Sequence, residues 1–209
     1  MNSQEVFLCD HCFPRLRINN APCPVCGVPQ QYKTPCLSCL FKPPPFRRTL
    51  APFLYAPPLS SAICELKYEK RIHFVREIAL LWLQTLKGQF LTETENFSVC
   101  PVPLHHRRLL KRGFNQSHLL AYQIFGKRKV KDLLVRHRAT IPQVALSRQE
   151  RLRNVRGAFK VRPGAQVAGK KILLFDDIFT TGATLRECAK VLRNAGAAEV
   201  WVAVIARAE

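Results

Sequence analysis

The stretch from Lys170 to Ala195 constrains the fold of this chain more than any other. It opens with four apolar residues, Ile172 to Phe175, which lack the alternation expected of a strand with one solvated face. Such a run is typical of a strand that is buried on both faces inside a parallel sheet. A second apolar run occupies positions 200–205, and between the two runs lies helical spacing at Leu185, Cys188, Ala189 and Leu192. A strand, a loop, a helix and a second strand in this order indicate an α/β fold.

Polar residues follow the first apolar run directly. Asp176 and Asp177 come first, and then a loop of small and hydroxyl residues, Thr180, Thr181, Gly182, Ala183 and Thr184. A loop that leads into a helix presents unpaired N–H groups and the positive end of the helix dipole, which suit a phosphate. Carboxylates repel phosphate, but they suit the hydroxyl groups of a sugar or a hydrated Mg²⁺ ion. We therefore predict a phosphorylated-sugar site at the carboxyl edge of the sheet; the alternative is a plain strand–turn–helix with a solvated acid pair.

The charge of the chain is strongly basic, with 33 Lys and Arg against 14 Asp and Glu. Residues 101–160 alone carry 15 cations and two acids. An excess of this size attracts polyanions such as nucleic acid or anionic lipid, unless it serves only solubility. The N-terminus lacks a signal-peptide pattern, and no apolar stretch approaches the roughly 20 residues that span a bilayer. We expect a soluble, cytoplasmic protein without a membrane span.

Six cysteines before residue 40 fall into three C-x-x-C pairs: Cys9/Cys12, Cys23/Cys26 and Cys36/Cys39. In a cytoplasmic chain such pairs favour metal sites over disulfides. Two pairs complete the tetrahedral site that Zn²⁺ prefers, and either the first two or the last two pairs can form it. We predict a small zinc ribbon over residues 1–42, stabilised by its metal. Redox-active or unligated thiols are the alternative.

The rest of the chain divides into a connector and a main domain. Residues 43–59 contain six prolines, and we interpret them as a stiff connector with an edge strand within 47–55. The main domain covers residues 60–209 and begins with two helices, over 60–91, whose aromatic residues we assign to the core.

A second strand–loop–helix unit begins near residue 97, and its loop is basic where the first is acidic. Arginine forks in such a loop suit pyrophosphate or a DNA backbone, although a solvated basic face is the plainer interpretation. The candidate ligands are Arg107, Arg108, Lys111, Arg112, Asn115 and Gln116. Residues 127–160 favour a mobile flap that ends in a short helix, and its Arg148 and Arg151 are further candidates for the anion.

Together these motifs resemble the ComF family of competence proteins, and the stretch after Lys170 resembles the phosphoribosyl-pyrophosphate (PRPP) motif of type I phosphoribosyltransferases. The resemblance covers nearly the whole chain. It implies an α/β, type I phosphoribosyltransferase fold, a mostly parallel sheet flanked by helices, with a small N-terminal zinc ribbon. It is carried by the paired cysteines, Leu66-Lys67-Tyr68, Pro101 to Leu104, Arg112 to Gln116, the spaced pattern Arg138/Thr140/Gln143/Leu146/Arg151/Asn154 and the PRPP motif.

The resemblance also assigns roles to residues. It implies that Asp176 and Asp177 contact the ribose of PRPP and that Thr180 to Thr184 surround its 5′-phosphate. Many members carry four C-x-x-C pairs, and the first pair here matches their second. This leaves Cys23, Cys26, Cys36 and Cys39 as the complete ribbon, with Cys9 and Cys12 as further candidate ligands.

Two functions are consistent with these features. The first, which the resemblance implies, is binding of single-stranded DNA during natural transformation, with PRPP or a nucleotide in the same site and Phe114 or Tyr122 stacking on bases. The alternative is an active phosphoribosyltransferase that uses Mg²⁺ and PRPP with a nucleobase- or amine-type acceptor; the sequence identifies neither the acceptor pocket nor a general base. A third, weaker hypothesis is that the ribbon docks to a DNA-uptake helicase or channel protein.

Overall fold

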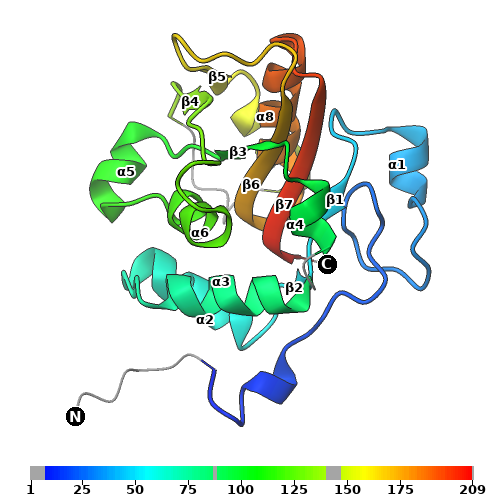
Figure 1. The fold of residues 1–209 in the computed structure, drawn as a ribbon, viewed down its shortest axis with the longest axis vertical. Helices are drawn as coiled ribbons and strands as arrows, with labels where there is room; N and C mark the ends of the chain where they lie inside the picture. The colour runs from blue at the N-terminus through cyan, green and yellow to red at the C-terminus, as the bar shows by residue number, and fades with distance from the viewer. Residues whose placement is uncertain (1–7, 87–88, 140–146, 209) are drawn as a thin grey trace.

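A parallel sheet lies at the centre of the chain, of which the computed structural model describes residues 8–86, 89–139 and 147–208. The strands run in the order β1-β7-β6-β3 (Figure 1). Strand β2 also pairs with β7, at residues 206–207, further along β7 than β1 does. All of these pairings are parallel, which confirms the predicted fold class. The strand bounds are Thr49–Leu50 (β1), Phe53–Leu54 (β2), Ser98–Pro101 (β3), Lys171–Phe179 (β6) and Glu199–Arg207 (β7).

Strand β6 is longer than the sequence predicts. The apolar run suggests an end at Phe175, but the strand continues to Phe179 because β7 stays paired with it as far as Arg207. Both acids of the PRPP-like motif therefore belong to the strand, and the loop begins only at Thr180. A strand backbone fixes the directions of the two carboxyl groups more tightly than a loop would.

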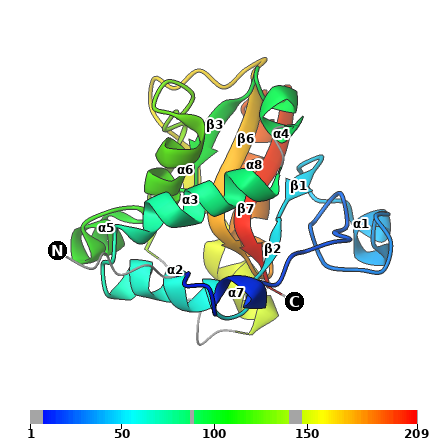
Figure 2. The ribbon, with the colours of Figure 1, turned by 60° about the horizontal axis from the view of Figure 1, so that its bottom comes forward.

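Helices cover both faces of the sheet (Figure 2). Helices α2, α3 and α6 share one apolar cluster with β3, β6 and β7, and α8 belongs to a second cluster on the other side. The predicted apolar face of α8 is confirmed, since Leu185, Cys188, Ala189 and Leu192 are all buried. Among the described residues, no helix is both long enough and apolar enough to cross a membrane. The helix bounds are Leu59–Tyr68 (α2), Phe74–Thr85 (α3), Gln116–Phe125 (α6) and Ala183–Asn194 (α8).

Trp82 of α3 lies at the centre of the first cluster. Its ring centroid is 5.6 Å from that of Phe90, 5.7 Å from that of Phe125 and 6.3 Å from that of Phe175, all edge to face. Its Nε1 donates a hydrogen bond of 2.9 Å to the carbonyl oxygen of Val204 in β7. The assignment of the aromatic residues of these helices to the core is confirmed for Trp82 and Phe74 but is wrong for Tyr68, which is 62% exposed.

The basic segment 127–160 is held by apolar side chains at its two ends. Strand β4 (Leu134–Arg136) pairs antiparallel with β5 (Phe159–Val161), and Leu134 and Phe159 are buried in the α8 cluster. The expectation of a flap therefore fails for these anchoring ends. Leu134 and Phe159 are too far apart in the sequence to form a helical or strand periodicity, yet both are buried in the same cluster.

The predicted short helix in this segment is confirmed as α7 (Arg148–Val155). A capping box at its N-terminus joins Ser147 and Glu150. Residues 140–146 lie outside the described part of the chain, as do the side chains of Arg148 and Arg151. The predictions for Thr140, Gln143 and Leu146, and for the two arginine side chains, stay predictions.

The N-terminal lobe packs against the edge of the sheet, with α1 beyond β1 (Figure 1). The backbone N–H of Thr49 in β1 donates to the carbonyl of Pro24 at 3.0 Å. The amide of Asn19 donates to the carbonyls of Gly27 and Ala51 at 2.9 and 3.1 Å. The edge strand expected within 47–55 is present as β1 and β2. The remaining helices are η1 (Phe13–Arg15), α1 (Leu37–Phe41), α4 (Gln89–Glu93) and α5 (His106–Arg112).

We predict that Trp82→Phe lowers the free energy of unfolding by about 2 kcal/mol, because it removes a buried hydrogen bond and part of a packed ring. Urea denaturation monitored by circular dichroism measures the change. Leu80→Ala, on the exposed side of the same helix, is the control and should change stability by less than about 0.5 kcal/mol. Equal effects of the two substitutions would contradict the central place of Trp82.

Candidate functional site

A cavity of about 670 Å³ opens at the carboxyl end of β6. Its walls come from α2, the segment after β3, α5, the end of β4, the end of β6 and the start of α8. Parts of the chain more than 100 residues apart in sequence therefore meet here. This is the edge of the sheet at which the sequence predicts a ligand.

Most of the predicted ligand residues line this cavity. They are Asp176, Asp177, Thr180, Gly182, Ala183, Thr184, Arg108, Lys111, Arg112 and Gln116. Thr181, Arg107 and Asn115 were also predicted but are not among the described lining residues. Asn115 instead caps α6, and its Nδ2 donates to the carbonyl of Val102 at 3.0 Å.

The two acids are held by groups from α2 and α6. The Lys67 ammonium of α2 forms an ion pair with Oδ2 of Asp177. Gln116 Nε2 donates to Oδ1 of Asp177 at 3.1 Å, and Ser117 Oγ donates to Oδ1 of Asp176 at 2.7 Å. Lys67 and Ser117 were not singled out as ligand residues from the sequence, although Lys67 lies in a motif that carries the family resemblance.

The environments of the two carboxyl groups separate their pKa values. Burial, and then the charge of Asp177, raise the pKa of Asp176 to about 8. Burial also disfavours ionisation of Asp177, but the charge and hydrogen bond of Lys67 outweigh it and lower the pKa of Asp177. The pair therefore carries one firmly ionised carboxylate and one carboxyl that titrates near physiological pH.

The loop after β6 has the geometry of an anion site. Gly182 is the N-cap of α8 and has a φ of 74°, in the left-handed region that favours glycine. A Cβ at this position would lie 2.3 Å from Cε2 of Phe179, so the position also lacks space for a side chain. The first residues of the twelve-residue helix α8, together with Thr180 and Thr184, line the cavity, so the N-terminus of this helix is available to an anion there.

Another part of the cavity wall is cationic. Arg108, Lys111 and Arg112 come from α5, and Arg136 comes from the end of β4. Arg136 is only 8% exposed, and burial together with the charge of Arg108 lowers its pKa to about 10. Burial, and then Arg112, also lower the pKa of Arg108. A bound anion would relieve this repulsion between guanidinium groups.

Arg136 is a site residue that sequence reasoning missed. It lies in a three-residue strand without a recognisable motif, and this strand is placed by its pairing with β5 and by a parallel bridge between Arg136 and His105. Conversely, Phe114 and Tyr122, predicted to stack on bases, are half-buried and pack against the core. The Tyr122 ring also lies edge-on to His118, with centroids 4.2 Å apart.

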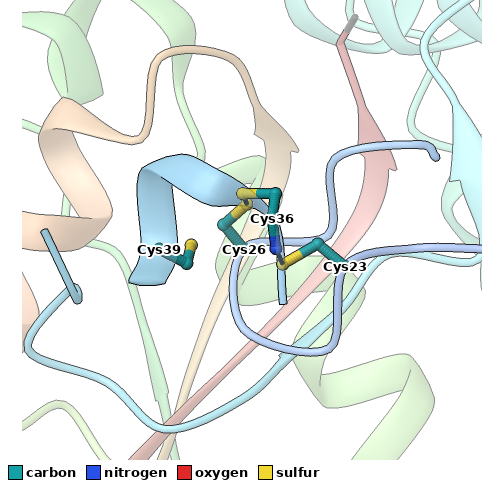
Figure 3. Close-up of side chains that lie close together, drawn as sticks. All are labelled: Cys23, Cys26, Cys36 and Cys39. Carbon is teal, nitrogen blue, oxygen red and sulfur yellow. Dashed lines mark hydrogen bonds between the residues drawn. The ribbon is translucent and has the colours of Figure 1, made fainter. Parts of the chain in front are cut away.

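Four cysteines in the N-terminal lobe form a second candidate site (Figure 3). The Sγ atoms of Cys23, Cys26, Cys36 and Cys39 lie within 4.8 Å of one another, and three of these residues are buried. The sulfurs of Cys26 and Cys36 are 3.7 Å apart. Ligands about 2.3 Å from a tetrahedral Zn²⁺ lie about 3.8 Å from each other, so the group fits this ion.

The alternative ligand set that includes Cys9 and Cys12 is not formed within the described residues. The first pair lies outside the cluster, and Cys9 is exposed. Within the cluster, the backbone N–H of Cys36 donates to Sγ of Cys23 at 3.3 Å. Such a bond favours the thiolate that metal binding requires.

Comparison with known proteins identifies the family. Residues 111–209 match the family model of the phosphoribosyl transferase domain. The chain is 36% identical over 206 residues to the DNA utilization protein YhgH of Escherichia coli K12, covering 96% of this chain and 90% of that protein. It is 30% identical over 223 residues to Competence protein F of Haemophilus influenzae, covering 97% of both chains. The chain belongs to the ComF family of phosphoribosyltransferase-like proteins. This ComF-family chain is also 27% identical over 198 residues to Competence protein ComFC of Bacillus subtilis, covering 91% of this chain and 80% of that protein.

The cysteine geometry predicts which pairs bind metal. We expect one Zn²⁺ per chain. Cys39→Ser should lose this ion because Cys39 belongs to the cluster, and Cys9→Ser should keep its zinc content because Cys9 does not. Elemental analysis of the purified proteins measures the stoichiometry. Loss of zinc in Cys9→Ser as well would mean that the first pair completes the site.

The acid pair predicts a pH dependence of stability. A carboxyl whose pKa is raised on folding binds more protons in the folded state, so stability falls as pH rises from about 4 to about 8. Asp176→Asn should remove this decline and make the protein more stable than the wild type at pH 8.5. Urea unfolding at pH 5.5, 7 and 8.5 tests this, with the exposed Glu95→Gln as control. A wild-type decline that persists in Asp176→Asn would assign it to other groups.

Proposed function

We propose that this ComF-family protein binds single-stranded DNA in DNA utilisation or natural transformation, and that its cavity accepts a sugar-phosphate unit of the strand or PRPP. The observation that carries the proposal is one cavity lined by a helix N-terminus, an acid pair in which Lys67 compensates Asp177, and a cluster of cations. These three parts match the 5′-phosphate, the ribose hydroxyls and the pyrophosphate of PRPP, and the helix N-terminus and the cations match successive phosphates of a DNA strand.

The ligand suited to the acid pair is a sugar and not a bare metal ion. Asp177 accepts from Lys67 and Gln116, so it is already compensated and offers little to a free Mg²⁺. Asp176 lines the cavity beside it and can accept from a ribose hydroxyl when ionised. A Mg²⁺ ion would enter with the pyrophosphate of PRPP, as ions bound mainly by phosphate oxygens do.

The charge balance of the cavity favours a polyanion. Six cations line it against two acids among the described residues: Lys67, Lys70, Arg108, Lys111, Arg112 and Arg136. One acid is engaged by Lys67, and the raised pKa of the other keeps it largely protonated at neutral pH. The remaining field is positive and suits consecutive phosphates of a strand.

The relatives support a DNA-related role through their names alone. One is named a DNA utilization protein and two are named competence proteins, and the similarity extends over most of each chain. The phosphoribosyl transferase domain match supports the proposal of a sugar-phosphate site. A nucleotide unit of DNA and PRPP share a phosphorylated pentose, so one site can serve both.

An active phosphoribosyltransferase is the alternative, and the titration of Asp176 favours it. A carboxyl with a pKa of about 8 is suited to proton transfer near neutral pH. In that case Arg108 and Arg136 would stabilise the charge on departing pyrophosphate. The loop after β6, at the N-terminus of α8, would hold the 5′-phosphate. The acceptor would be a nucleobase or an amine.

The test is fluorescence anisotropy of a labelled oligodeoxythymidine titrated with the full chain, with and without PRPP and Mg²⁺. We expect salt-sensitive binding that PRPP displaces. The double variant Asp176→Ala/Asp177→Ala should lose PRPP binding, measured by calorimetry. PRPP binding without any binding of DNA would favour the transferase.

A matched pair of charge reversals tests the placement of DNA. Arg112→Glu lies in the cavity wall and should weaken DNA binding and lower the slope of log K against log salt by about 1. Lys190→Glu, on the exposed side of α8, makes the same charge change away from the cavity and should leave the slope close to that of the wild type. Equal slopes for the two variants would place DNA elsewhere.

A further inference from the structure

Arg207, at the end of β7, joins the two candidate sites. Its Nη1 donates to the carbonyl oxygens of Phe179 and Thr180 at 2.8 and 2.7 Å, where the phosphate loop begins. Its Nε donates to the carbonyl oxygen of Cys26 at 3.2 Å. Cys26 belongs to the Cys23–Cys26 turn of the ribbon, which we call the knuckle. One guanidinium therefore holds the backbone of both segments in a fixed relation.

The ring of Phe179 makes a second connection between the same segments. The Arg207 guanidinium lies 4.5 Å from its centroid, and Phe46 meets it edge-on at 6.2 Å. On another side the ring fills the space that a Cβ of Gly182 would occupy. Phe46 directly follows the three prolines that connect the ribbon to the main domain. The Phe179 ring therefore contacts both this connector and the N-cap of α8.

The knuckle and the loop also share one apolar cluster. Cys23, Cys26 and Cys39 belong to the same buried group as Phe179 and Ala183. A metal that fixes the four sulfurs would fix the Cys26 carbonyl, and through Arg207 the start of the loop. Without metal, the four sulfur–metal bonds that would fix the conformation of the knuckle are missing.

We propose that Arg207 makes the four-cysteine ribbon a positioning part of the sugar-phosphate site, so that metal in the ribbon raises the affinity of the loop for a phosphorylated pentose. This inference rests on the proposed function, because it names what controls that same loop. Coupling between two sites is reciprocal, so the ligand must also raise the affinity of the ribbon for metal by the same factor. Typical couplings change affinity by about 5-fold to 150-fold.

The first experiment measures the coupling in both directions on the full chain. PRPP with Mg²⁺ is titrated by calorimetry into zinc-loaded protein and into protein stripped with a chelator that is then removed. We expect at least about a 5-fold loss of affinity on stripping. In parallel, the affinity of the protein for zinc is measured by equilibrium competition with a chromogenic chelator, with and without PRPP, and PRPP should raise it by the same factor. Equal PRPP affinities and equal zinc affinities would overturn the proposal.

A matched pair of substitutions assigns the coupling to Arg207. Arg207→Lys keeps the charge but replaces the guanidinium that reaches the carbonyls of Cys26, Phe179 and Thr180 with a single ammonium. The zinc-loaded variant should therefore bind PRPP more weakly than the wild type. Stripping of zinc should also change its PRPP affinity less. Arg193→Lys is the control, because Arg193 also spans two carbonyls, those of Ala197 and Ala198, at the far end of α8. If stripping unfolds the whole chain, the zinc-loaded comparison still decides. Identical PRPP binding in Arg207→Lys and the wild type would refute the role of Arg207.

Hydrogen exchange separates this inference from the proposed function. If the zinc-loaded wild type binds neither the oligodeoxythymidine nor PRPP, the proposed function fails. The coupling is then judged by exchange alone: removal of zinc should speed exchange in residues 178–186 of the wild type, while residues 116–125 of α6 keep their protection. Unchanged exchange in 178–186 would count against the connection itself.

Discussion

Two adjacent carboxyl groups inside a buried strand determine how the rest of this molecule is arranged. Taking them out of water is unfavourable unless partners arrive from elsewhere in the chain. Lys67 comes from α2 for one acid, and Ser117 comes from α6 for the other. Both helices also pack in one apolar cluster with β6, and residues of both line the cavity.

The sequence predicts well what depends on neighbours along the chain. The period of Leu185, Cys188 and Leu192 identifies the buried side of α8, and the cysteine spacing limits the metal site to two alternatives, one of which is formed. The acids and the loop of the PRPP-like motif lie within ten residues, so their meeting at one cavity follows from local structure. The family resemblance adds the parallel order of the sheet.

Contacts between distant segments are what the sequence does not reveal. Arg136 looks like one more cation in a basic stretch, and it is long-range backbone pairing, with β5 and with His105, that brings it to the cavity. The end of β6 is misjudged for the same reason, because the continuing pairing with β7 extends it past polar residues. Asn115 stands beside lining residues in the sequence, but its side chain caps α6. Its role as a ligand residue stays a prediction.

The raised pKa of Asp176 has a consequence for any ligand that needs this carboxyl in its ionised form. At neutral pH the group must first lose its proton, which then passes to the surrounding buffer. Binding heats measured in phosphate and in Tris would differ by the ionisation enthalpies of the two buffers, even with the same protein–ligand contacts. Proton release on binding is thus a thermodynamic property that follows from placing two acids side by side in one strand.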